Sequence, residues 1–475
     1  MRSTSRHLTW IVTIAIAAVA TACKESYSIS DPPGELTLDA QLRQTIGVWG
    51  TAPILPMARQ DPALVDLGRS LFFDKILSGN RDVACATCHA PADHATDALS
   101  LPVGTGGSGE GALRTLGPGR QFVPRNAPSL LNQGLGFFYM FWDGRVNEEG
   151  GFGRFKTPLG VALPSGLRNL LAAQAMLPVV NRTEMRGVIG DRDRAGNPNE
   201  LAAIADATPA EVWSAAMRRL LAVQEYQAKF NAAYPGTPVS ALGFEHAANA
   251  IAAFEMEAFT RTNSPFDRFL AGNDRAMSAD EKRGALLFFG KARCSTCHSG
   301  PLLGGQSFAN VGAPQIGPGV GAAAPLDIGR GEEFANVREY KFAFRVQPLR
   351  NVELTGPYMH SGAYPTLAAV VRHYNNADSA QRNYDPSHLA PAVRAVYHGD
   401  AATVKAVLET LDFRLRQPMG LTKTEQSELV AFLESLTDPA ARDLRSIIPT
   451  AGQASATAGL ASATAGLASA NKGTR

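Results

Sequence analysis

The chain has 475 residues, of which 45% are hydrophobic and 19% are charged, and its formal net charge is +2. This length is sufficient for two or three domains with hydrophobic cores. The nearly balanced charge and the lack of a basic tract argue against a nucleic-acid partner.

The first residues have the pattern of an export signal. Arg2 and Arg6 precede an apolar run from residue 8 to residue 22, which is short for a membrane span. We therefore predict a signal peptide over residues 1–22 and a periplasmic location for the mature protein.

Cys23 follows the small residues Ala20-Thr21-Ala22, a pattern that resembles a lipobox. On this interpretation Cys23 is lipidated, and the protein is a membrane-anchored lipoprotein. The alternative is an ordinary signal peptide that is cleaved nearby. Residues 23–55 are predicted to form an N-terminal linker.

Two copies of a C-x-x-C-H motif, residues 85–89 and 294–298, carry the chemistry of the chain. This motif is the attachment signature of c-type haem, in which two thiols bond to one porphyrin and the following His ligates the iron. Two zinc knuckles would need further Cys/His pairs at metal-ligand spacing, and the sequence has none. We therefore predict two covalently bound haems c. The attachment residues are Cys85, Cys88, His89, Cys294, Cys297 and His298.

The segments that precede the two motifs resemble each other. Residues 67–75 (LGRSLFFDK) and 283–291 (RGALLFFGK) have apolar spacing suited to a helix that packs on haem. This internal duplication predicts a mainly α fold with little β structure, in which two cytochrome c-like domains in tandem share a haem–haem interface. Further helices are expected at residues 167–180, 200–234, 246–259, 366–375 and 424–436.

These elements divide the chain into domains. An N-terminal cytochrome c domain with a helical insertion is placed at residues 56–265. A C-terminal cytochrome c domain follows at residues 266–445. Residues 446–475 contain the repeat ASATAGL and are expected to be a disordered low-complexity tail.

The order of the motifs LFFD, CxxCH, RNAPSL, FWDGR, EM, LFFG, CxxCH, LRN and TGPYMHSG resembles the bacterial dihaem cytochrome c peroxidase and MauG superfamily. The resemblance implies an oxidoreductase that reduces hydrogen peroxide at the N-terminal haem, with electrons passed via the C-terminal haem. One alternative is a MauG-like oxidase that modifies a partner protein through a high-valent dihaem state. Another is a non-catalytic dihaem electron carrier.

The resemblance also assigns residues around the first haem. Classical peroxidases have a distal His sixteen residues after the first haem His, and this chain has Thr105 there, so the haem is expected to be open, as in MauG. Glu184 matches the family's general acid/base and Gln174 the residue that orients peroxide. Trp142 matches the Trp between the haems. The alternatives are a surface position for Glu184, core packing for Trp142, and ligation by the nearby His94.

For the second haem, the resemblance gives Tyr374 as the far-face iron ligand, where classical peroxidases have Met and MauG has Tyr. Met359 and His373 are the alternatives. One calcium ion between the haems is also implied, because hard oxygen ligands suit calcium. Its matching ligands are Asn126, Thr355 and the carbonyl group of Pro357.

The resemblance implies two kinds of partner besides hydrogen peroxide. One is a small periplasmic electron donor, such as a cytochrome c or a cupredoxin, and the other is a protein substrate. Members of the family often form dimers, so a homodimer also stays open.

Overall fold

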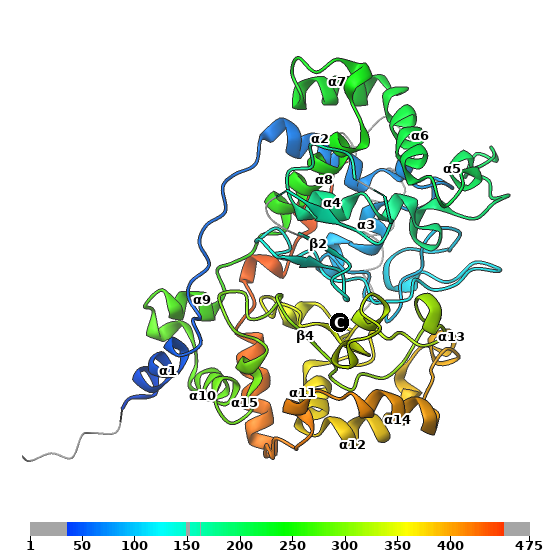
Figure 1. Cartoon of the computed structure of the whole chain (residues 1–475). Coiled ribbons are helices and arrows are strands. Elements are labelled where there is room, and N and C mark those ends of the chain that lie inside the picture. The colour runs from blue at the N-terminus through cyan, green and yellow to red at the C-terminus, as the bar shows by residue number, and fades with distance from the viewer. Residues whose placement is uncertain (1–35, 149–152, 162, 451–475) are drawn as a thin grey trace, which may run out of the picture. The chain divides into compact units, whose positions relative to one another are not determined.

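The computed structural model describes residues 36–148, 153–161 and 163–450 (Figure 1). The predicted signal peptide and Cys23 lie outside these residues. All the elements described below belong to the part of the chain that begins at Leu38. Within the described residues, no helix has both the length and the apolar character needed to cross a bilayer.

The fold is mainly helical, as the sequence predicts. Helices of the first half are α1 (Leu38–Gly47), α2 (Pro62–Phe73), α3 (Cys85–Cys88), α4 (Leu170–Ala175), α5 (Glu200–Ala203), α6 (Pro209–Leu221), α7 (Gln224–Ala233) and α8 (Phe244–Phe259). Helices of the second half are α9 (Pro265–Leu270), α10 (Ala279–Phe289), α11 (Leu367–Asn375), α12 (Ala377–Arg382), α13 (Pro391–Arg394), α14 (Ala401–Glu409) and α15 (Lys423–Glu434).

Short antiparallel strands make up the small β content of the described residues. One sheet has the order β1-β2-β3, with Tyr139 opposite Asn147 and Glu148 opposite Phe155. The other pairs β4 with β5. The strands are β1 (Tyr139–Met140), β2 (Val146–Glu148), β3 (Phe155–Lys156), β4 (Phe308–Ala309) and β5 (Phe344–Arg345).

The predicted duplication appears as two equivalent helix pairs. A Cβ atom at Gly68 of α2 would lie 1.9 Å from the carbonyl oxygen of Ala250 in α8, and one at Gly284 of α10 would lie 1.8 Å from that of Glu428 in α15. Only glycine permits such close helix contacts. The helices α8 and α15 therefore pack in the same way in the two haem units: the first unit contains α2 and α8, and the second contains α10 and α15. Ser278 and Glu281 form a capping box at the start of α10.

The linker expected over residues 23–55 requires a correction, because it contains α1. Leu42 and Ile46, one helical turn apart, are buried in a cluster with Phe266 and Phe269. Arg43 of the same helix pairs with Asp274 at 2.5 Å. The i, i+4 spacing of the two apolar residues is the reason that this segment folds onto the second unit.

The tail expected from residue 446 also begins later than predicted. The 3₁₀ turns η15 (Pro439–Ala441) and η16 (Arg445–Ile447) bring the chain back to the first unit, where Leu444, Ile447 and Ile448 pack with a cluster of aromatic residues. Burial of these side chains extends the fold beyond the predicted boundary. Residues 451–475 lie outside the described part of the chain.

Candidate haem-binding sites

The first C-x-x-C-H motif lies on the wall of a cavity of about 360 Å³, which we call the first cavity. Cys85 and Cys88 begin and end the single turn of α3, and His89 caps that turn. The helical turn brings both thiols and the imidazole to the same cavity, as attachment of one porphyrin requires.

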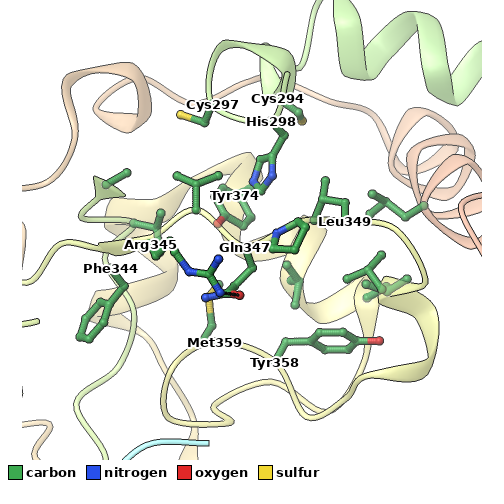
Figure 2. A pocket seen from close by; sticks show the side chains of 18 of the residues that line it. Cys294, Cys297, His298, Phe344, Arg345, Gln347, Leu349, Tyr358, Met359 and Tyr374 are labelled. Atoms are coloured by element: carbon green, nitrogen blue, oxygen red, sulfur yellow. Dashed lines mark hydrogen bonds between the residues drawn. The ribbon is translucent and has the colours of Figure 1, made fainter. Parts of the chain in front are cut away.

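The second motif lines a separate cavity of about 240 Å³, the second cavity (Figure 2). Cys294 belongs to the short turn η8 (Cys294–Thr296), with Cys297 and His298 directly after it. Figure 2 shows the ring of His298 pointing away from the two cysteines into the space between the labelled side chains.

Both histidines are held in the form that a metal requires. Nδ1 of His89 lies 3.3 Å from the carbonyl oxygen of Ala95, and Nδ1 of His298 lies 3.0 Å from that of Leu303. A carbonyl group only accepts, so each Nδ1 carries the proton and leaves the Nε2 lone pair for iron. Burial lowers the pKa of each ring to about 4, so both are neutral at pH 7.

Several buried polar atoms on the cavity walls have no hydrogen-bond partner among the described residues. They are Arg145 Nε and Glu255 Oε2 in the first cavity, Gln347 Nε2 in the second, and Arg345 Nη1 in both. Buried polar groups are normally paired, so these atoms indicate that the cavities are built for a bound group with polar substituents. A porphyrin with carboxylate side chains meets this requirement, and the residues present fit a haem in each cavity.

Glu184, the predicted acid/base, and Gln174, predicted to orient peroxide, both line the first cavity. Glu184 lies on η5 (Arg182–Arg186), a single π-helical turn, and the amide of Asn181 donates to its Oε1 at 3.1 Å. Burial raises the pKa of the Glu184 carboxyl, and Arg145 opposes this shift. The Glu184 carboxyl therefore holds its proton up to a higher pH than a surface Glu does.

The segment around Gly104 packs against the backbone of Thr183 and Glu184. A Cβ atom at Gly104 would lie 2.0 Å from the carbonyl oxygen of Thr183. Thr105 donates its hydroxyl to Asp82 at 2.7 Å and its backbone N–H to the carbonyl of Glu184 at 2.9 Å. Thr105 is not among the residues that line the first cavity.

Comparison with known proteins identifies the family. The model of the di-haem cytochrome c peroxidase family matches residues 62–275. The methylamine utilization protein MauG of Methylorubrum extorquens is 30% identical over 383 residues, which are 80% of each chain. The cytochrome c551 peroxidase of Pseudomonas aeruginosa is 33% identical over 66% of this chain and 71% of its own. The chain belongs to the di-haem cytochrome c peroxidase family.

Solved structures confirm the fold. A MauG-like protein associated with microbial copper homeostasis superimposes with a TM-score of 0.55 at 23% identity and covers 86% of this chain and 98% of its own. The di-haem peroxidase BthA of Burkholderia thailandensis gives a TM-score of 0.54 at 23% identity over 84% and 91% of the two chains. Membership of the di-haem family implies two haems c, and it includes both peroxidases and MauG proteins.

In the second cavity of this di-haem protein, Tyr374 and Met359 both lie on the wall (Figure 2). His373 does not line it. Its Nε2 lies 2.7 Å from the carbonyl of Val311, and its Nδ1 lies 2.9 Å from the hydroxyl of Tyr364. With both nitrogens engaged, His373 is unsuited to ligate iron. His94 does not line the first cavity, and its Nδ1 lies 3.1 Å from the carbonyl oxygen of Ala441.

Trp142 lines both cavities, between the two expected haem positions. Its indole N–H donates to the carbonyl of Asn126 at 2.9 Å. The three residues matched to calcium ligands, Asn126, Thr355 and Pro357, all line the second cavity. Within the described ranges, no cluster of three or more His, Cys, Asp or Glu is placed to hold a metal ion. Calcium would therefore depend on neutral protein oxygens.

Sequence analysis missed several residues of the cavity walls, namely Arg145, Glu255, Arg345 and Gln347. Arg145 lies in the quoted FWDGR motif, which could have indicated it. Glu255 is 7% exposed on α8, and burial raises its pKa to about 8. A Glu within an apolar helix face was its only signal in the sequence.

Proposed function

We propose that the chain is an exported di-haem peroxidase that reduces hydrogen peroxide at the haem held by His89, with electrons that arrive through the haem held by His298. The proposal rests on the first cavity, which is lined by the C-x-x-C-H motif, Gln174 and Glu184 together. An electron carrier would not need a buried carboxyl of raised pKa beside an iron-ligating His.

The reaction consumes one hydrogen peroxide, two electrons and two protons and yields two waters. The haem, when bound, supplies the iron at which the O–O bond breaks. Glu184 would take a proton from one peroxide oxygen and give it to the other, which would then leave as water. The amide of Gln174 orients peroxide, and Asn181 fixes the Glu184 carboxyl through its hydrogen bond. Trp142, on the wall of both cavities, is proposed as the electron path.

A MauG-like oxidase that modifies a partner protein is the second candidate. Two observations favour it: Thr105 occupies the position of the classical distal His and hydrogen-bonds away from the first cavity, and Tyr374 lines the second. Burial raises the pKa of the Tyr374 phenol. A bound cation such as ferric iron would therefore be needed to stabilise its phenolate form. A phenolate ligand stabilises oxidised iron.

Further proposals concern location and calcium. The apolar run of residues 8–22 supports export to the periplasm and a lipid on Cys23, which the intact mass of the mature protein would test. The grouping of Asn126, Thr355 and Pro357 on one cavity wall supports an interhaem calcium ion. Metal analysis after exhaustive dialysis would test it.

The deciding experiment is an EPR and optical spectrum of the diferric protein before and after one equivalent of hydrogen peroxide. We expect one high-spin and one low-spin haem, an immediate reaction at the high-spin haem, and steady turnover with a reduced cytochrome c or cupredoxin. Two low-spin haems that do not react with peroxide would contradict the proposal. A fast single reaction without turnover on either donor would favour the MauG-like alternative.

The same spectra test Tyr374. The Y374F variant should change the signal of the haem held by His298 and leave that of the haem held by His89 unchanged. M359L is the control, since Met359 lies on the same wall. If M359L alters the low-spin signal and Y374F does not, Met359 is the ligand.

A further inference from the structure

Arg345 is the only charged side chain that lines both cavities among the described residues. It lies on β5 and is 3% exposed. Its backbone N–H donates to the carbonyl of Trp142 at 2.6 Å, and its Nε donates to the carbonyl of Phe141 at 3.1 Å. Arg345 is therefore fixed to the segment that separates the two haem positions.

The charge of Arg345 has no carboxylate partner within the described residues. Its Nη2 donates to the neutral amide of Gln347 at 3.0 Å, and its Nη1 has no partner. Two other buried arginines differ: Arg125 contacts Asp143 and Asp327 at 2.5 and 2.6 Å, and Arg350 contacts Asp267 at 2.8 Å.

An uncompensated buried cation is costly unless an anion is supplied from elsewhere. Burial lowers the pKa of Arg345 to about 10, with Asp143 opposing the shift, so the guanidinium stays charged at neutral pH. Arg345, with its unpaired Nη1, lines both cavities. The compensating anion must therefore belong to what the cavities bind.

A haem carries two propionate carboxylates on the edge opposite the two thioether bonds. In Figure 2, Arg345 and Gln347 lie on the far side of His298 from Cys294 and Cys297, where that edge of the second haem would face. A guanidinium presents five donors in a planar fork. Phe141 and Gln347 each accept one of those of Arg345, and the three that are left are enough for two carboxylates.

We propose that Arg345 binds one propionate of each haem and links the two haems electrostatically. The proposal rests on two bound haems and is independent of which donor or substrate protein the enzyme uses. With one cation shared by both propionates, any change of charge at Arg345 acts on both irons. Gln347, whose Nε2 is also unpaired, completes the site on the side of the second haem.

The test is a spectroelectrochemical titration of the holoprotein, with no peroxide present. The R345Q variant should lower the midpoint potentials of both haems, because loss of a positive charge favours the ferric state. The expected size is about tenfold in the ratio of reduced to oxidised haem at a fixed potential. R145Q is the matched control: Arg145 lines only the first cavity, so only the first haem should shift.

A shift of one haem alone in R345Q, or of neither, would overturn the proposal. If R345Q does not incorporate haem, R345K serves instead, because its ammonium group keeps the charge without the fork. The propionate bending bands of both haems should then move in the resonance Raman spectrum, and unchanged bands would overturn the proposal. A wild-type protein that fails to turn over peroxide would refute the peroxidase function and leave these outcomes intact.

Discussion

Glu184 shows how one side chain can be tuned by its place in a cavity. Burial raises its pKa, and a proton acceptor works only when ionised, so the rate of reaction with peroxide should fall as the pH drops through that pKa. Because the pKa is raised, the rate should begin to fall at a higher pH than it would with a free Glu. The E184Q variant should react about 100-fold or more slowly and lose this pH dependence. Stopped-flow mixing with peroxide across pH measures both.

E257Q is the control for this prediction, since Glu257 is an exposed carboxyl of α8. It should keep the wild-type rate and pH profile. An E184Q variant with an unchanged rate would mean that another group moves the proton. Glu255 is then the next candidate, because its carboxyl lines the same cavity.

Among the individual site residues, those that belong to a motif could be predicted from the sequence, and those outside any motif could not. The spacing of C-x-x-C-H fixes Cys85, Cys88 and His89 through covalent chemistry alone. Glu184 and Gln174 came from family resemblance, and the structure places both in the first cavity. Arg345 could not be found, because its significance lies in the absence of a partner, which only the packed structure shows.

Among the elements, the helix pairs α2/α8 and α10/α15 set the frame for the two haems. Because a Cβ atom at Gly68 would lie 1.9 Å from the carbonyl of Ala250, G68A must separate the helices, and we expect a loss of about 1–3 kcal/mol in the free energy of unfolding. Thermal or denaturant unfolding measures it. Gly47, with nothing near its Cβ position, is the control, and G47A should be close to neutral. Equal effects of the two variants would contradict the close crossing.

Helices with strong periodicity were predicted well, whereas short ones were not. The expected helices at residues 366–375 and 424–436 match α11 and α15 to within two residues at each end. The helix α1 was missed because it is short and mostly polar, and its fold depends on the contact of Leu42 and Ile46 with the second unit. Such tertiary support leaves little trace in local sequence.

For the whole molecule, the two halves are tied together around Trp142. Arg125 joins Asp143, next to Trp142, to Asp327 of the second half through buried ion pairs. Arg345 of the second half holds the carbonyl of Trp142. The described segment between the haem positions is thus fixed from both halves, which suits a path whose electron-transfer distance must stay constant.

The C-terminal segment of residues 441–448 forms a second connection between the two halves, and its removal should destabilise the first half. Leu444 is 1% exposed and packs with Phe72, Phe73 and Phe254 of the first unit, although it follows the second unit in sequence. L444A should therefore lower the free energy of unfolding by about 2–5 kcal/mol, while L113A, at a leucine that is 77% exposed, should be close to neutral.

The helices that L444A destabilises distinguish this arrangement from two independent domains. Hydrogen exchange should accelerate in α2 and α8 of the L444A variant, because their aromatic cluster loses its cover, and should be less affected in α10 and α15. Faster exchange confined to α10 and α15 would mean that the segment stabilises only its own half. The expected result implies that the first haem unit, cut out at residue 265, would lack part of its core, since that part is supplied from residues 441–448 at the other end of the fold.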